Sequence, residues 1–209
     1  MIIIDAFGQG SEEWTKARIG NPGASSFNRI VTTKGEPSKS RQEYLYELCG
    51  EIISGRKTDG YSNQRMADAL NAESESRLYY ELVHDVEVTQ VALCYPNDLK
   101  RYHTSPDGLI LSEKAGFETK DAIPKVQAKR LDKGTLPTEH FTQCQGGLLV
   151  TDYGYWIFQS YCSGMPTLTL RVERDEAFIK KLKEELERFC FDLDKMVKKI
   201  KEITDGRSK

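Results

Sequence analysis

Two short segments in the middle of the sequence carry residue types that bind divalent metal ions. Asp107 lies in a Ser-Pro-Asp-Gly segment, and Glu118, Thr119 and Lys120 follow a short distance further on. Residues two apart on a strand point to the same face, so Glu118 and Lys120 are expected to point together toward Asp107. Mg²⁺ prefers carboxylate and carbonyl oxygens, and phosphodiester hydrolysis uses such an ion to stabilise developing charge and to activate water. The pattern therefore predicts metal-dependent phosphodiester hydrolysis.

Each of these residues has an expected role and a simpler alternative. Asp107 and Glu118 would hold the metal, and the backbone carbonyl of Thr119 could add a third oxygen. The ammonium group of Lys120 could orient the attacking water or stabilise the charge on phosphorus. By itself, Glu-x-Lys is common as a surface ion pair on an exposed strand, and Asp-Gly is common in turns. Their combination within one predicted hairpin favours the catalytic interpretation.

A third carboxylate, Glu73, lies in a segment, residues 65–84, that contains no helix breaker. At helical spacing it shares a face with Met66 and Leu70. A carboxylate on a buried face needs a metal or a partner. The partner could equally be Arg77, one turn further along.

The elements that must position these residues follow from the apolar pattern. Helices are predicted at 41–53, 65–84, 138–150 and 175–203, with a helix start near Ser25. Strands are predicted at 86–95, 109–111, 116–120, 155–161 and 167–173, the second and third forming a hairpin. Residues 8–18 are polar and turn-rich. The expected fold class is α/β, with a central mixed β-sheet flanked by helices and the C-terminal helix packed across the sheet.

The helix predicted at 138–150 contains Gln143 and the pair Gly146-Gly147. Phe141, Cys144 and Leu148 form its core-facing stripe, so Gln143 is expected off the core. Each glycine costs about 1 kcal/mol in a helix, and close packing against the sheet or DNA would explain the pair.

Composition limits the remaining possibilities. The 209 residues fit a single domain, 1–209, and the net charge of −2 gives no global reason to expect nucleic acid. A local cluster of Lys125, Lys129 and Arg130 could track a phosphate backbone or be a solvated loop. Five widely spaced cysteines, no long apolar run and no recognisable signal peptide favour a cytoplasmic protein with reduced thiols.

Several motifs together resemble a known family. Residues 9–14 read Gln-Gly-Ser-Glu-Glu-Trp, and Arg18-Ile19-Gly20 and Ala24-Ser25 follow. With Ser-Pro-Asp-Gly, Glu-x-Lys and the pair Gln143 and Gln145, they resemble the phage lambda exonuclease and YqaJ-like viral recombinase family, within the PD-(D/E)XK nuclease group. The resemblance extends nearly from end to end. The sequence departs from the family pattern at two positions. Ala69 stands where the family often has glycine. At the family's upstream acidic position, the register places either Asn97 or Asp98.

The resemblance implies a restriction-endonuclease-like core and Mg²⁺-dependent 5′→3′ exonuclease activity that degrades one strand of duplex DNA to 5′-mononucleotides, with Mn²⁺ able to substitute for Mg²⁺. It implies that Glu73 and Gln143 belong to the catalytic site and that Arg18, Ser25 and Gln145 bind DNA or its 5′-phosphate. A guanidinium group and a helix N-terminus both suit phosphate. It further implies a homotrimer around the duplex, a phage single-strand annealing protein as partner, and the cytoplasm of a bacterial host.

Two other functions fit the same residues. One is a structure-specific or restriction-like endonuclease on the same core. The other is a non-catalytic DNA-binding module whose acidic residues are structural.

Overall fold

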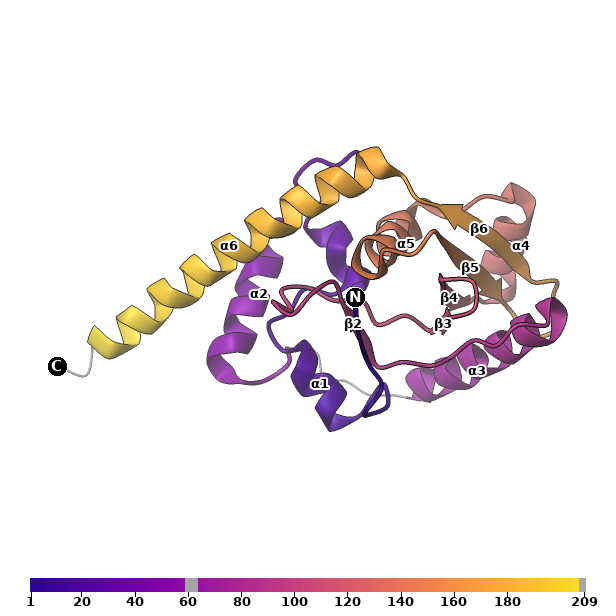
Figure 1. The fold of residues 1–209 in the computed structure, drawn as a ribbon, viewed down its shortest axis with the longest axis horizontal. Coiled ribbons are helices and arrows are strands. Elements are labelled where there is room, and N and C mark those ends of the chain that lie inside the picture. The colour runs from indigo at the N-terminus through magenta and orange to yellow at the C-terminus, as the bar shows by residue number, and fades with distance from the viewer. Residues whose placement is uncertain (59–63, 207–209) are drawn as a thin grey trace.

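The computed structural model describes residues 1–58 and 64–206 and contains a four-stranded mixed sheet (Figure 1). Its strand order is β3 (Gly108–Ile110), β4 (Ala115–Asp121), β5 (Tyr155–Tyr161) and β6 (Leu168–Glu173). The β4–β5 pair is parallel, whereas β3–β4 and β5–β6 are antiparallel. The predicted fold class is confirmed, and the predicted hairpin forms one residue earlier than expected at each strand.

The parallel pair requires a crossover, which the chain supplies with α4 (Pro124–Lys133) and α5 (Thr138–Thr151). On one face of the sheet, Trp156 and Phe158 pack against Cys144 and Leu148 of α5. On the other face, Phe117 packs with Tyr80 of α3 (Gln64–His84). Because side chains alternate along a strand, Glu118 and Lys120 of β4 face α5, while Thr119 faces α3.

The glycine pair in α5 allows this helix to approach its neighbours closely. A Cβ atom on Gly147 would lie 2.5 Å from the ring of Trp156, and one on Gly146 would lie 2.6 Å from the ring of Phe27. Phe27 belongs to η1 (Ala24–Arg29), a 3₁₀ helix. Packing against the sheet, as expected, accounts for Gly147, and packing against η1 accounts for Gly146.

Replacement of Gly147 by alanine is expected to destabilise the fold. Overpacking against Trp156 costs about 1–3 kcal/mol, which exceeds the gain in helix propensity of about 1 kcal/mol. Gly50 in α2 (Arg41–Ser54) is a matched control, because a Cβ there meets nothing within 4 Å and Gly50→Ala should stabilise the protein. Urea denaturation of both variants checks this expectation. Equal stabilisation by both substitutions would contradict it.

The N-terminal residues contribute one strand to a second, two-stranded sheet and form a helix that packs beside that sheet. β1 (Ile2–Ile4) pairs with β2 (Leu93–Tyr95) in antiparallel fashion. The expectation of turns over residues 8–18 is partly wrong, because α1 (Glu12–Arg18) forms there. Its N-cap is Ser11, whose Oγ accepts a hydrogen bond from the backbone N–H of Trp14. Ser followed by two Glu residues was the sequence signal for this helix start.

The strand predicted at 86–95 is only partly present. β2 covers three of its residues, and Thr89 makes an isolated bridge to Leu109. Val88 and Val91 are both buried, but they belong to different hydrophobic clusters. The alternating pattern therefore reflects burial on two sides of an irregular segment rather than a continuous ladder.

Near Ser25 the predicted helix start is also shifted. η1 follows Gly23, which provides no side-chain cap, so Ser25 lies inside the first turn. The basic segment that includes Lys125 is helical rather than a loop, with Pro124 at the first turn of α4.

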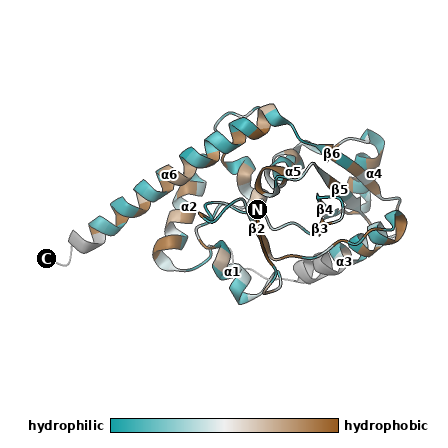
Figure 2. Cartoon of the chain, viewed as in Figure 1, coloured by the Kyte–Doolittle hydropathy of each residue, from teal (hydrophilic) through white to brown (hydrophobic). Residues whose placement is uncertain are grey.

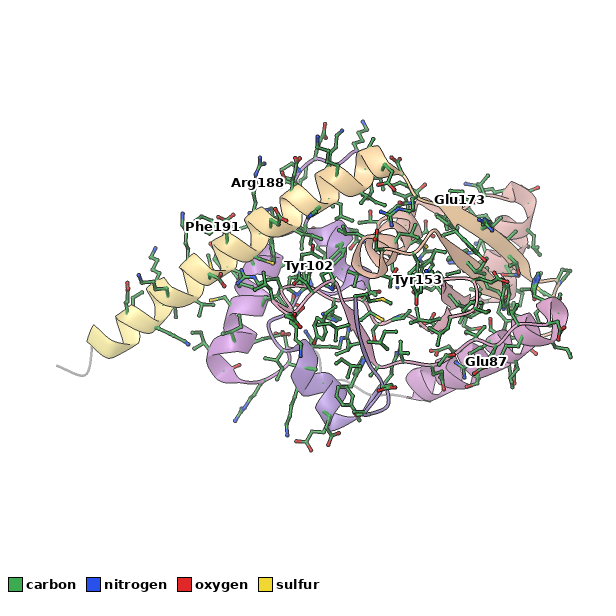
Figure 3. The ribbon with its side chains drawn as sticks, viewed as in Figure 1. Glu87, Tyr102, Tyr153, Glu173, Arg188 and Phe191 are labelled. Carbon is green, nitrogen blue, oxygen red and sulfur yellow. The ribbon has the colours of Figure 1, made fainter. Side chains whose placement is uncertain are left out.

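The long C-terminal helix α6 (Glu176–Gly206) packs against α2 and α5 and then extends past them (Figure 1). The expectation that it packs across the sheet is therefore wrong, because α5 already covers that face. Its first turn reaches the sheet through Ile179. Its apolar residues alternate with polar ones along the helix (Figure 2). Tyr102, labelled in Figure 3, shares the core beneath α6 with Phe189.

Among residues 1–58 and 64–206, none of the helices combines the length and the apolar composition that a bilayer crossing requires.

Candidate active site

One small cavity collects half of the site residues that the sequence predicts. Its volume is about 170 Å³, and its walls come from α1, η1, the segment before β3, β4 and α5. The predicted residues that line it are Arg18, Ser25, Asp107, Glu118, Lys120 and Gln143. They come from five parts of the chain, so the cavity forms only in the folded protein.

Asp107 lines this cavity and is partly buried. Its Oδ2 accepts a hydrogen bond of 2.7 Å from the backbone N–H of Thr119, which fixes the carboxylate against β4. Burial raises the pKa of Asp107 well above its usual value, and the nearby charge of Glu118 raises it further. Lys120 acts in the opposite direction. Two neighbouring carboxylates, one of them buried, repel each other when both are ionised, and a bound cation would offset this repulsion.

Glu118 and Lys120 point to the same side of β4, as expected from their spacing. The Nζ of Lys120 forms an ion pair with Oε1 of Glu118, and Nε2 of Gln143 donates to the same oxygen. Burial by itself would lower the pKa of Lys120, but Glu118 and Asp107 together raise it. Lys120 therefore stays protonated and can act as a fixed positive charge. Gln143 is off the core, as predicted, and its amide faces Glu118.

Glu73 lies beside this group without lining the same cavity. It lines a neighbouring cavity of about 390 Å³, and Gln9 forms part of the wall of both. Burial raises the pKa of Glu73, Arg77 lowers it, and Glu118 raises it. The ion pair with Arg77 is present at 3.6 Å, while a metal-binding role for Glu73 stays a prediction.

The sequence predicts that Glu73 shares a helix face with Met66 and Leu70. The side chains of Met66 and Leu70 lie outside the part of the chain that the structure describes, so this prediction stays a prediction.

The donor set fits a hard divalent cation of the Mg²⁺ type. Within the described residues, no three His, Cys, Asp or Glu side chains lie as close together as the ligands of one metal ion. The candidate ligands are therefore Asp107 and Glu118, with the carbonyl of Thr119. Mg²⁺ commonly uses one or two carboxylates and keeps several waters, so this small set matches its chemistry. Zinc and iron–sulfur sites would need histidine or cysteine ligands.

Arg18 adds a second cation to the lining of this cavity, besides Lys120. The guanidinium carbon of Arg18 lies 3.9 Å from the centre of the Trp14 ring, and its Nε donates to Nε2 of His103 at 3.4 Å. Neither terminal nitrogen of Arg18 has a hydrogen-bond partner among the residues that the structure describes. Burial lowers the pKa of Arg18 from its ordinary value. Ser25 is exposed in the first turn of η1 on the same cavity.

Sequence reasoning left several residues of this cavity without a role. Nε1 of Trp14 donates to Oγ of Ser105 at 2.9 Å and lies 3.2 Å from the carbonyl of Ala92. The amide of Gln9 bridges the carbonyls of Val91 and Pro106. Ser105 directly precedes the Pro-Asp-Gly segment, and this adjacency was the available signal. Trp14 and Gln9 lie far away in the sequence, where spacing carries no information about contact.

Gln145 does not belong to this cavity, which corrects the expectation that it binds DNA. Its Nε2 donates to the carbonyl of Glu173, and its Oε1 accepts from the N–H of Asp175. The side chain is only 1% exposed, so it has no access to a phosphate. It fixes the connection between β6 and α6, next to Glu173 in Figure 3.

The basic residues of α4 also lie outside the active-site cavity. Lys129 and Arg130 line a separate cavity of about 280 Å³ between α4 and α5, and Lys125 is exposed. Arg130 donates to Oγ of Ser160 and lies 3.1 Å from Nε2 of His140. Contact of these three with DNA stays a prediction.

The upstream acidic position also has no counterpart at the site. Asn97 and Asp98 are both exposed, and neither lines the active-site cavity.

Comparisons with known proteins identify a family and related structures for this chain. The model of the YqaJ-like viral recombinase domain matches residues 13–154. The chain is similar to an alkaline exonuclease (LHK-Exo) from Laribacter hongkongensis, with 26% identity over 94% of this chain and 99% of that one and a TM-score of 0.84; the complex of that enzyme with dAMP matches equally well. A phage-related exonuclease from Haemophilus somnus 129PT shares the fold, with 13% identity over 86% of this chain and 96% of that one and a TM-score of 0.67. A search of curated proteins finds no match.

Proposed function

Because the chain belongs to the family of YqaJ-like viral recombinase domains, we propose that it is a phage-type exonuclease that degrades one strand of duplex DNA from its 5′ end. The sequence resemblance to this family is thus confirmed, and the similarity to an alkaline exonuclease supports a nuclease. The observation that carries the finer proposal is the single cavity, whose lining brings the guanidinium group of Arg18 together with two carboxylates and a lysine.

The residues of this cavity divide the work between binding and chemistry. Arg18 and Ser25 would hold the terminal 5′-phosphate, since a guanidinium group binds phosphate through two parallel hydrogen bonds. The first phosphodiester of the strand then lies toward Lys120 and Glu118. The protonated Lys120 stabilises the negative charge that develops on the phosphate oxygens, and the amide of Gln143 holds Glu118 in place.

Asp107, Glu118 and the carbonyl of Thr119 would hold a Mg²⁺ ion, with Glu73 nearby and with Mn²⁺ able to replace Mg²⁺. When bound, the ion supplies a water of lowered pKa and a positive charge next to the scissile phosphate. The backbone N–H of Thr119 keeps the Asp107 carboxylate oriented throughout. Burial of Asp107 and Glu118 strengthens the electrostatic interactions that they make.

The proposal includes partners that fit such an activity. The products would be 5′-mononucleotides and a 3′ single-stranded tail, which a phage single-strand annealing protein would coat during recombination. The basic residues of α4 would contact the DNA backbone outside the cavity. A homotrimer that encircles the duplex is part of the same proposal, as is the cytoplasm of a bacterial host.

A comparison of DNA ends tests the proposal. Covalently closed circular duplex, linear duplex with a 5′-phosphate and linear duplex with a 5′-hydroxyl are incubated with the protein in Mg²⁺ or in EDTA. The linear 5′-phosphorylated duplex should be degraded in Mg²⁺ alone, and the circle should stay intact. Nicking of the circle would instead establish a restriction-like endonuclease. DNA binding without cleavage under any divalent ion would establish a non-catalytic module.

A further inference from the structure

A chain of hydrogen bonds at the wall of the active-site cavity ends on the guanidinium group of Arg18, and both His103 and Arg18 line the cavity. It begins at the backbone carbonyl of Lys100, which accepts from Nδ2 of Asn21. Oδ1 of Asn21 lies 2.9 Å from Nδ1 of His103, and Nε2 of His103 lies 3.4 Å from Nε of Arg18. Neither the catalytic roles nor the phosphate-binding roles described above involve Asn21 or His103.

The direction of every hydrogen bond in this chain is fixed. A backbone carbonyl only accepts, so the amide of Asn21 must present its nitrogen to Lys100 and its oxygen to His103. The oxygen of Asn21 only accepts, so the proton of the neutral imidazole must be on Nδ1. Nε2 of His103 is then left as an acceptor, which is what the Nε–H group of Arg18 requires.

The position of the imidazole ring is also restricted. His103 is 1% exposed, and its backbone N–H and carbonyl bond to Pro22 and Ala24. A Cβ atom on Gly23 would lie 2.9 Å from Nε2 of His103, so the glycine permits this close approach. Burial, together with the charges of Arg18 and Lys57, lowers the pKa of His103 to about 3, and the ring therefore stays neutral at ordinary pH.

We propose that His103, with its tautomer set by Asn21, is a positioning residue that determines specificity for a 5′-phosphate. By accepting from Nε of Arg18, it holds the guanidinium plane against Trp14 and leaves both terminal nitrogens for two phosphate oxygens. This inference rests on the proposed binding of the 5′-phosphate by Arg18. It concerns how that arginine is held, and the contact between arginine and phosphate belongs to the proposed function.

Two conservative substitutions of His103 distinguish its role in positioning Arg18 from the simple filling of space. His103→Gln keeps an acceptor at the distance of Nε2, whereas His103→Asn keeps a partner for Asn21 but is too short to reach Arg18. The measurement is the ratio of kcat/KM for 5′-phosphorylated duplex to that for 5′-hydroxyl duplex. The ratio should fall about tenfold in His103→Asn, which corresponds to roughly 1.4 kcal/mol. In His103→Gln the ratio should stay within about threefold of the wild-type value. A change of this size is close to the variation in the free energy that a single hydrogen bond contributes.

His84, an exposed histidine at the end of α3, provides the control, and His84→Asn should leave the ratio unchanged. If the unmodified protein prefers the 5′-phosphate and His103→Asn retains that preference, the inference is overturned and the proposed function stands. If the unmodified protein degrades both ends equally, the proposed phosphate contact of Arg18 fails first.

A second measurement needs no variant and no cleavage. Nitrogen chemical shifts of ¹⁵N-labelled histidine report which ring nitrogen carries the proton. The inference requires the proton of His103 on Nδ1 in the free protein. A proton on Nε2, or a rapid exchange between both positions, would overturn it even if either His103 variant fails to fold.

Discussion

Lys120→Ala should reduce cleavage of linear duplex by roughly 10²–10³-fold or more, the cost of removing one transition-state donor. The side chain is held beside both carboxylates, and Glu118 and Asp107 keep it protonated. Its loss removes a fixed positive charge from the reacting phosphate. DNA binding at constant salt should change little, because Lys120 lies inside the cavity rather than along the duplex.

The substitution needs a control for stability, because Glu118 is only 2% exposed and would lose its ion-pair partner. Removing one member of a buried pair typically costs about 3–5 kcal/mol, although Gln143 still donates to Glu118 here. Lys198→Ala, the same change at an exposed position of α6, should affect neither activity nor stability. Folded Lys120→Ala protein with full activity would remove Lys120 from the mechanism.

Asp107→Asn should abolish both binding of Mg²⁺ and cleavage, the latter by at least roughly 10³-fold. Asparagine retains an oxygen that can accept from the N–H of Thr119, so the local structure should persist. What disappears is the negative charge that would bind the ion. Calorimetric titration with Mg²⁺ and Mn²⁺ measures the loss directly. Asp98→Asn, an exposed control, should titrate as the unmodified protein does. Unchanged heats for Asp107→Asn would refute the assigned ligand set.

The same substitution should stabilise the metal-free protein. Burial and Glu118 raise the pKa of Asp107 above its ordinary 3.8, so folding disfavours the ionised group. This penalty is absent below pH 3.8, grows as the pH rises through the raised pKa, and is then fully present. In EDTA, the melting temperature of Asp107→Asn should therefore exceed that of the unmodified protein by a margin that widens from pH 4 upward. Each 1 kcal/mol corresponds to roughly 2–4 °C for a chain of this size.

The catalytic end of the site could be predicted from sequence because its residues are close together in the chain. Glu118 and Lys120 lie in one hairpin and Asp107 directly precedes it, so strand alternation determines which side chains meet. The long helices could also be predicted from the sequence, because the apolar spacing of α2 and α6 is repeated over several turns. Local pattern and local structure coincide in these segments.

Residues that depend on tertiary contact could not be placed in this way. Gln143 and Gln145 are two apart on α5, yet one faces Glu118 and the other is bonded to the connection before α6. Helical geometry separates them by more than half a turn. The resemblance nevertheless implied roles at the site for both, Gln143 in catalysis and Gln145 in DNA binding. Sequence reasoning assigned no role to His103, because its partners Asn21 and Arg18 lie far away in the chain.

The elements that form the cavity lie far apart along the chain, and this affects when the cavity can form during synthesis on the ribosome. The cavity needs α1 near the beginning of the chain and α5 beyond its midpoint, and α5 is seated by Trp156 on the following strand. Nascent chains that end before that strand lack the surface against which α5 packs, so they cannot close the cavity. A nuclease built in this order acquires its hydrolytic capacity only after the strand that contains Trp156 has been synthesised.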